Sequence, residues 1–381
     1  MKLKPRFIAI TAVVLLLYVG LNAYIGWHGA WLLDNAGWFH PGIGYWIVFA
    51  IIAVAYLLGR VKLIPGPLRR LLKVVGAVYF GLIEFALILL VIADLVVWIA
   101  KLAGYHGDSL LLSVGWTVFI LLVLLMAWGS RNAWSPIVRT HEIKLDKWAG
   151  GRKELRVAVA SDLHLGNLVG RRYLGRLVRE MNAMEPDLIL FAGDVIDDDI
   201  EPFVRNRMSE VLQGLQSPLG VYAVLGNHEY YGGSLEEYVE KMAEIGIPVL
   251  MDETVLVEDV FYVAGRKDKT AETADSTGRV SVEELLAGLD KRVPIILMDH
   301  QPYEFDKAAA AGADILLCGH THRGQFAPNH WVTRRLFELD WGYLLKDKMH
   351  VIVSSGYGTW GPPIRLASRS EIIQLNIRFE G

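Results

Sequence analysis

Residues 155–164 read LRVAVASDLH and decide the fold of the C-terminal part of the chain. The first six positions form a largely apolar, partly β-branched run, which is typical of a strand buried within a sheet. An acid and an imidazole, Asp162 and His164, follow this run directly. Similar runs alternate with amphipathic stretches such as 171–184, which predicts an α/β domain whose sheet is covered on both faces. The further predicted strands are 187–192, 221–225, 261–264, 294–298, 314–318, 350–354 and 371–377, and the further predicted helices are 203–215, 234–245, 281–289 and 303–311.

Polar side chains cluster at the ends of five of these predicted strands. In open α/β sheets, ligands bind beyond the carboxyl ends of the strands, because the loops there converge on one crevice. Carboxylate, amide and imidazole groups together suit divalent Mn, Fe or Zn ions. Each segment alone is common in ordinary turns, but five of them in order, each at a strand end, predict a metal site. The segments are Ser161–His164, Gly193–Asp197, Gly226–Glu229, Asp299–Pro302 and Gly319–His322.

In this series of motifs the chain resembles the calcineurin-like metallophosphoesterases, over about residues 150–381. The resemblance implies a four-layer αββα sandwich, two divalent metal ions and hydrolysis of a phosphate ester or anhydride. It also implies metal ligands at Asp162, His164 and His322 for one ion and at Asn227, His300 and His320 for the other, with Asp194 as the bridge and His228 as the catalytic imidazole. The segments 319–325 and 356–365 are similar to the branch that includes the YkuE and YaeI phosphoesterases. That branch also resembles a UDP-diacylglucosamine pyrophosphatase.

The implied chemistry requires no protein nucleophile, because the two ions would hold a hydroxide as the nucleophile. They would also neutralise the phosphate oxygens as charge develops in line. His228 would stabilise the transition state or protonate the leaving oxygen. Arg323 and Arg365 lie in motif-bearing segments and are candidates for substrate binding as an arginine fork around phosphate. The alternative for each arginine is an ordinary surface or structural salt bridge. Arg323 stands where the family more usually has glycine, which bears on substrate selection.

The N-terminal part has the composition of a membrane domain. Of the whole chain, 53% is hydrophobic and the mean hydropathy is +0.33, and nearly all of this excess precedes residue 130. A helix needs about 20 apolar residues to cross the hydrocarbon core. The stretch 7–27 is too long for the core of a signal peptide and is predicted to be a retained helix. We predict an all-α transmembrane domain of about four helices over residues 1–135, from the stretches 7–27, 43–59, 74–100 and 109–129, and then the phosphoesterase domain over 150–381.

The basic residues of the short loops predict the orientation in the membrane. The first loop has no Lys or Arg, and the third has only Lys101. The N-terminus and the second loop are basic, with Lys2, Lys4, Arg6, Arg60, Lys62, Arg69, Arg70 and Lys73. We therefore expect a multi-pass protein of the inner cell membrane, with its N-terminus and its catalytic domain in the cytoplasm. The short stretch 43–59 is the critical one, because the parity changes if it does not cross.

Two features of the apolar segments have alternative interpretations. Glu84 and Asp94 lie within the third stretch, where a carboxylate is costly and often functional. For Asp94 we favour hydrogen bonding inside the helix bundle. The segment 326–348 interleaves Trp331 and Trp341 with basic residues. This pattern suits a flap that faces lipid headgroups, and also a loop packed on the sheet edge.

The predicted function is hydrolysis of a phosphodiester or pyrophosphate bond in a lipid-linked or membrane-proximal substrate. The expected partners are a phosphate-containing substrate and membrane lipids. One alternative is a membrane-tethered phosphodiesterase for soluble nucleotides, and another is a membrane sensor or scaffold with a weakly active domain. The net charge of −3, without a basic patch, gives no reason to expect nucleic-acid binding. The single cysteine, Cys318, excludes an intramolecular disulfide.

Overall fold

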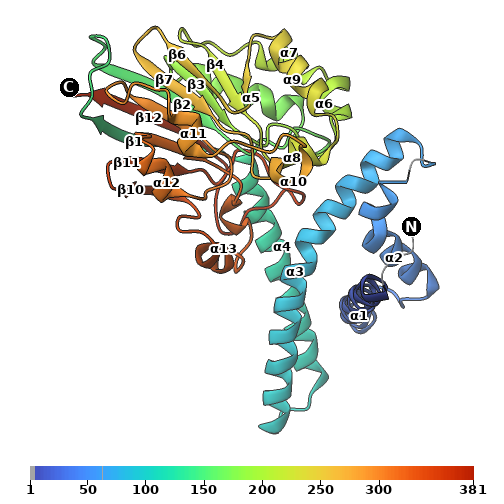
Figure 1. Ribbon diagram of the computed structural model, residues 1–381. Coiled ribbons are helices and arrows are strands. Elements are labelled where there is room, and N and C mark those ends of the chain that lie inside the picture. Colours follow the sequence, from blue (N-terminus) through green and yellow to red (C-terminus); the bar gives the residue numbers. More distant parts are fainter. Residues whose placement is uncertain (1–4, 62) are drawn as a thin grey trace. The chain divides into compact units, whose positions relative to one another are not determined.

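The computed structural model describes residues 5–61 and 63–381. Lys2, Lys4 and Lys62, on which part of the predicted orientation rests, lie outside the described residues. The chain separates into two compact units, Met1–Trp128 and Gly129–Gly381. The first is helical and the second contains all of the strands that the described residues form (Figure 1).

The first unit contains the four predicted apolar helices, but one of them is too short to cross a membrane as predicted. Helix α2 (Ile43–Leu58) has 16 residues, and at 1.5 Å per residue it is about 24 Å long, short of a hydrocarbon core of about 30 Å. The helices α1 (Pro5–Asn35), α3 (Gly66–Leu102) and α4 (Asp108–Trp134) are long and apolar enough to span. Three of the four predicted helices are therefore long enough to span by themselves, whereas α2, which Gly42 and Gly59 bound, is shorter.

Small residues let α2 pack closely against its neighbours. Gly76 of α3 lies directly against the backbone of Tyr56, so that any side chain there would clash. The Tyr18 hydroxyl of α1 donates a hydrogen bond to the Ala53 carbonyl (2.5 Å), and the Tyr45 hydroxyl of α2 donates one to the Gly26 carbonyl (2.8 Å). As the residue numbers rise along α2, those of its contacts on α1 fall. Helix α2 therefore runs back along α1.

The second unit is built on two six-stranded sheets of mixed direction. Parallel pairing joins β2, β3, β4 and β5 in the first sheet and β11, β9, β8 and β7 in the second. The first sheet has the order β1 (Ile137–Leu145), β12 (Glu371–Phe379), β2 (Glu154–Ala160), β3 (Leu188–Ala192), β4 (Val221–Val224) and β5 (Val249–Leu250). The second has the order β10 (Gly342–Lys346), β11 (Met349–Val353), β9 (Ile315–Cys318), β8 (Ile295–Met298), β7 (Phe261–Gly265) and β6 (Glu253–Val257).

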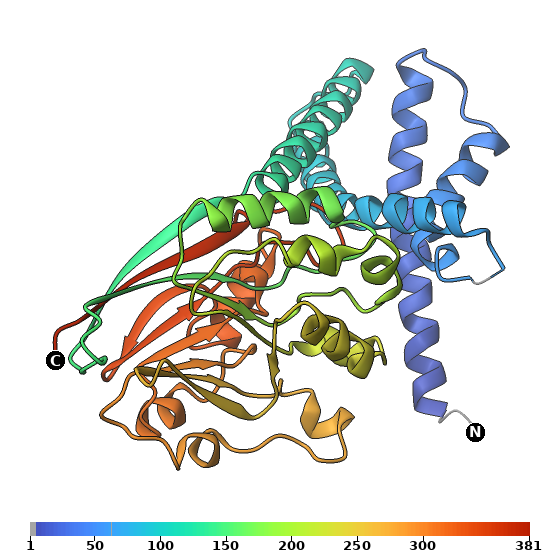
Figure 2. The same cartoon turned by 90° about the horizontal axis from the view of Figure 1, so that it is seen from above.

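Three apolar cores hold these sheets in four layers. The central core joins the facing sides of both sheets, with Val157 and Leu190 from one and Val263 and Leu317 from the other. The outer face of the first sheet is covered by α5 (Arg171–Asn182), α6 (Glu201–Arg205), α7 (Met208–Leu212) and α9 (Leu235–Glu244). The outer face of the second is covered by α11 (Val282–Leu286) and α12 (Phe305–Ala310). Figures 1 and 2 show the two sheets between these helix layers, and the predicted αββα sandwich is confirmed.

Two local predictions differ from the structure. The predicted helix 203–215 is divided into α6 and α7, because Arg207 has a left-handed backbone with φ 49° that no continuous helix allows. Strand β1 lies in the segment that the sequence analysis left between its two predicted domains. It is an edge strand whose burial alternates along the chain, so it lacks the continuous apolar run of the inner strands. It pairs in parallel with β12 over nine residue pairs.

Candidate metal centre

The predicted metal ligands sit on strained turns at the carboxyl ends of strands. Five of the seven have a positive φ, with values from 46° to 73°; they are Asp162, His164, Asp194, His320 and His322. A left-handed backbone at a non-glycine residue costs about 1–3 kcal/mol and is found mainly at functional sites. Backbone hydrogen bonds hold these turns, since the Asp162 amide donates to the Gly193 carbonyl (3.0 Å) and the His164 amide to the Asp194 carbonyl (3.1 Å).

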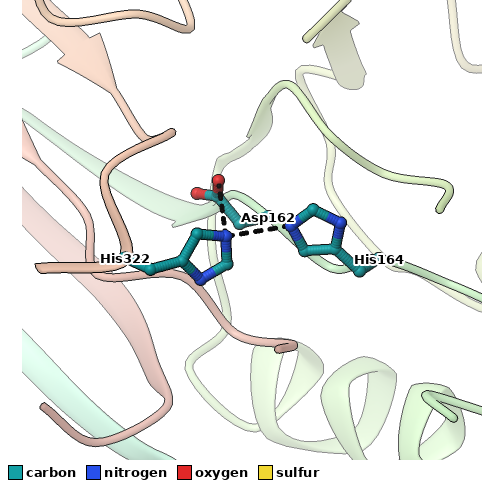
Figure 3. Close-up of side chains that lie close together, drawn as sticks. All are labelled: Asp162, His164 and His322. Carbon is teal, nitrogen blue, oxygen red and sulfur yellow. Dashed lines mark hydrogen bonds and ion pairs between the residues drawn. The ribbon is translucent and has the colours of Figure 1, made fainter. Parts of the chain in front are cut away.

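The first group of side chains is Asp162, His164 and His322, from the ends of β2 and β9 (Figure 3). The His322 Nε2 atom lies 2.9 Å from His164 Nε2 and 3.4 Å from Asp162 Oδ1. All three side chains are buried, and burial raises the pKa of Asp162 to about 6 and lowers the pKa of His164 to about 3. Burial lowers the pKa of His322 as well, so both rings favour the neutral form of imidazole, which is the form that binds a metal.

The second group is Asp194, His300 and His320, from the ends of β3, β8 and β9. The His300 Nε2 atom lies 3.0 Å from Asp194 Oδ2, and the His320 Nδ1 atom donates to Asn227 Oδ1 at 2.8 Å. Asp194 lies close to both groups, since its Oδ2 atom is also 4.0 Å from His164 Nε2. The structure thus brings together all seven predicted ligands, in the two sets that the resemblance implies.

The hydrogen bonding of His300 shows that a cation fits this place. Its Nδ1–H donates to the Ala192 carbonyl at 2.7 Å, which directs the lone pair of Nε2 at the Asp194 carboxylate. Two acceptors cannot hydrogen-bond to each other, and His300 Nε2 is buried without a hydrogen-bond partner among the described residues. Either a proton or a metal ion must lie between them, and the surrounding oxygen and nitrogen donors suit a divalent metal.

His228 is held by an acid at the edge of the cluster. Its Nδ1 lies 2.7 Å from Asp198 Oδ1 and 3.6 Å from Asp197 Oδ1. Burial alone would lower the pKa of His228, but the hydrogen bond to Asp198 and the charge of Asp194 raise it to about 9. These partners favour the protonated imidazole, which is the form that can act as an acid.

Glu229 organises the centre, although it was not predicted as a site residue. Its carboxylate is buried and accepts hydrogen bonds from the backbone amides of Gly226 (2.7 Å), Ile196 (3.0 Å) and Asp194 (3.1 Å). It thereby ties the loop after β4 to the loop after β3. The signal available in the sequence was its place directly after His228 in the motif. A buried acid needs several hydrogen-bond donors, and here the backbone amides of the two loops supply them.

The contacts of Arg365 favour the structural alternative over the predicted phosphate contact. The side chain is fully buried, and its guanidinium donates hydrogen bonds to the carbonyls of Ser355 (2.6 Å) and Gly358 (2.6 Å). The same Nη2 atom that donates to the Gly358 carbonyl also lies 3.0 Å from His322 Nδ1. The guanidinium therefore packs behind the His322 ring, on the side opposite to Asp162 and His164. Arg365 is a positioning residue in this fold.

Arg323 packs on Trp341 of the segment 326–348, which was predicted as a flap, and the two tryptophans of this segment have different surroundings. The Arg323 guanidinium lies over the Trp341 ring at 4.1 Å, and Arg139 lies over the same ring at 4.8 Å. The Trp341 indole N–H donates to the buried Glu371 carboxylate at 3.1 Å. Trp341 is therefore a packed, structural residue, whereas Trp331 is 64% exposed. The sequence pattern alone could not separate these two tryptophans.

A further aromatic residue that sequence reasoning missed lies beside the site. The Trp360 ring is exposed, and its centroid is 6.3 Å from that of His228. Gln325 holds the loop of Trp360 through hydrogen bonds from its amide to the carbonyls of Trp360 and Pro362, both at 3.0 Å. An exposed ring at this position can contact a substrate that approaches His228.

Comparison with known proteins gives the same assignment as this geometry. The sequence pattern of the calcineurin-like phosphoesterases matches residues 155–324. A metallophosphoesterase of Aquifex aeolicus is 31% identical over 263 residues, which cover 68% of this chain and 99% of that protein. The chain belongs to the calcineurin-like metallophosphoesterases.

Two further proteins are similar to parts of this chain. A bovine protein named transmembrane protein with metallophosphoesterase domain is 32% identical to this chain over 271 residues, which are 68% of this chain. The chain spans only 61% of the length of that bovine relative. Among solved structures, the Thermus thermophilus protein TT1561 is 13% identical, with a TM-score of 0.39 over 54% of this chain and 91% of that one.

Proposed function

We propose that this metallophosphoesterase hydrolyses a phosphodiester or pyrophosphate bond of a lipid-linked substrate, with two divalent ions of the Mn, Fe or Zn class. The observation that carries the lipid-linked part is an exposed apolar helix beside the metal ligands. Helix α13 (His330–Leu336) begins eight residues after His322, and none of its seven residues is buried. A UDP-diacylglucosamine-type pyrophosphate is one substrate of this class.

In the proposed centre, the three side chains Asp162, His164 and His322 hold one ion. Asn227, His300 and His320 hold the other, and Asp194 lies between the two groups. When bound, the ions supply Lewis-acid stabilisation of the phosphoryl oxygens and of the attacking water. Glu229 and Arg365 keep the ligand-bearing loops and the His322 ring in place.

The role proposed for His228 is to donate a proton to the leaving oxygen. Asp198 accepts from Nδ1, so the opposite ring nitrogen, Nε2, is the one that delivers the proton. The neighbouring carboxylates stabilise the imidazolium before the reaction. Trp360, whose ring lies near His228, would bound the space in which the leaving group stands.

The apolar-basic face of α13 gives the site a surface suited to a bilayer. Trp331 and Leu336 are 64% and 67% exposed, and Arg334 and Arg335 lie on the same short helix. Phe337, which follows the helix, has its ring 6.1 Å from the ring of His320. Apolar side chains flanked by basic ones favour the boundary between acyl chains and anionic headgroups. We infer that α13 inserts there and admits the lipid-linked phosphate to the metal ligands.

The double variant Trp331→Ser with Leu336→Ser should lower kcat/KM on a lipid-linked pyrophosphate by about tenfold or more, because two exposed side chains that bind acyl chains or the bilayer are lost. Activity on a small chromogenic phosphodiester should change less than about twofold. Trp148→Ser, which removes another exposed tryptophan of the same unit, is the matched control. Equal losses on both substrates would show that α13 is only structural, and faster turnover of soluble nucleotides than of any lipid would favour a tethered nucleotide phosphodiesterase.

The proposed location is the inner cell membrane, with the catalytic unit in the cytoplasm. Basic residues Arg60, Arg69 and Arg70 lie between α2 and the apolar part of α3, where the positive-inside rule places cytoplasmic loops. Because α2 runs back along α1, the chain returns toward the side of its N-terminus before α3 begins. The proposed orientation requires that α2, with its 16 residues, returns the chain to the side of its N-terminus.

A reporter that is active only in the cytoplasm, fused after Gly381, should give full signal in cells, whereas a reporter that is active only outside the cytoplasm should give none. The same pair fused after Gly104, in the turn between α3 and α4, should give the opposite pattern. Activity of the exported reporter at both positions would reverse the proposed orientation of the catalytic unit.

A further inference from the structure

The helical unit contains a cavity that the proposed hydrolysis does not use. Its volume is about 320 Å³, within the range of pockets that bind small molecules. Side chains of α1, α3 and α4 line it, and most of them are apolar, including Leu32, Leu90 and Val118. All three helices are apolar enough to cross a membrane, so the lining is chemically compatible with an acyl chain.

A small polar cluster faces this apolar space. The Tyr24 hydroxyl donates to Asp94 Oδ2 at 2.6 Å, and His28 Nε2 lies 3.4 Å from the same oxygen. The Asp94 side chain remains 51% exposed, and both Asp94 and His28 line the cavity. His28 Nε2 is buried and has no hydrogen-bond partner among the described residues. One carboxylate oxygen is thus fixed by Tyr24, and hydrogen-bonding capacity in the cluster is left over.

A basic residue stands on the same helix face as this acid. Lys101 follows Asp94 by seven residues on α3, which is two helical turns or about 10 Å along the axis. Both side chains line the cavity. The cavity therefore combines an apolar wall with one negative and one positive group. Because the lysine side chain is long and flexible, its ammonium can approach Asp94 closely enough for one lipid headgroup to contact both.

We propose that this cavity binds one molecule of a zwitterionic phospholipid with a primary amino headgroup. The ammonium group hydrogen-bonds to Asp94, the phosphate pairs with Lys101, and one acyl chain lies against the apolar wall. Tyr24 and His28 occupy one carboxylate oxygen of Asp94. An ammonium with three N–H donors can satisfy the other oxygen, where a quaternary ammonium cannot. The site is separate from the metal ligands, and the inference does not depend on the identity of the hydrolysed substrate.

The test is lipid binding to the full-length protein in detergent, measured by native mass spectrometry and by the thermal shift on adding lipid. Phosphatidylethanolamine, phosphatidylcholine and phosphatidylglycerol with identical acyl chains are the probes. Phosphatidylethanolamine should bind at least tenfold more tightly than the other two. Asp94→Asn should remove this preference, while Asp34→Asn, which changes an acid outside the cavity lining, should keep it.

A second variant keeps the test decisive if Asp94→Asn disturbs the helices. Val114→Phe fills the apolar part and leaves Asp94 in place, so it should lower phosphatidylethanolamine binding at least tenfold. Hydrolysis of a small chromogenic phosphodiester reports that the catalytic unit is intact in each variant. Equal affinity for all three lipids, or unchanged phosphatidylethanolamine preference in both Asp94→Asn and Val114→Phe, would overturn the proposal.

Discussion

Asp194→Asn is expected to reduce hydrolysis by at least about 10³-fold. In our proposal Asp194 binds both ions, and its loss would remove several kcal/mol of transition-state stabilisation. Asp194 Oδ2 lies 3.0 Å from His300 and 4.0 Å from His164, so the side chain reaches both groups of ligands. Asparagine keeps the shape and one oxygen but not the charge. Metal analysis of the purified variant should show a fall from two ions per chain to one or fewer.

The fold should survive this change, because the turn of Asp194 is also held through its backbone by Glu229. Circular dichroism should therefore match the parent protein. Asp290→Asn is the matched control, since that acid is paired on the surface with Arg292 and should retain two ions and full activity. A variant at Asp194 that keeps both activity and two bound ions would refute the bridging role.

His228→Asn is expected to lower kcat by about 10²–10⁴-fold while leaving the metal content unchanged, because the residue supplies a proton in our proposal and is not a ligand. The loss should depend on the leaving group. A substrate that releases a nitrophenolate needs little protonation and should lose less than one that releases an alkoxide. This dependence separates an acid from a residue that only supports the fold.

The control for this variant is His141→Asn on strand β1, where the ring stacks with Tyr343 and takes no part in the cluster. Its activity should stay within about twofold of the parent protein, as for most surface substitutions. His164, Asp194 and His228 also lie close enough together to form a further group of possible metal ligands. If His228→Asn lost a metal ion together with its activity, His228 would have to be reassigned as a ligand.

Much of the fold could be predicted because its inner strands carry a signal that does not depend on their neighbours. The runs that became β2, β3, β8 and β9 are apolar at nearly every position, as burial on both faces demands. The clustered ligands followed from the same logic, since polar residues at the carboxyl ends of parallel strands meet at one edge. Strand β1 was missed because one of its edges is free and its pattern alternates.

The roles of single long side chains could not be predicted from the sequence. Arg365 and Arg323 both stand in motif-bearing loops, yet one lies fully buried behind His322 and the other over Trp341. Trp331 and Trp341 belong to one basic-apolar segment, yet only Trp341 finds an acceptor in Glu371. Such differences arise from tertiary contacts between residues far apart in the sequence, which local pattern does not encode.

The junction between α4 and β1 determines where the chain can be truncated to remove its apolar helices. Only two residues separate Trp134 from Ile137, and the last turn of α4 belongs to the second unit. The Arg365 amide donates to the Gly129 carbonyl (2.9 Å), and the Asn132 side chain donates to the Arg365 carbonyl (3.1 Å). A soluble fragment that began at residue 150 would lack β1 and the anchor of the arginine behind His322. A fragment that began just before Gly129 would keep both, at the cost of a short apolar overhang.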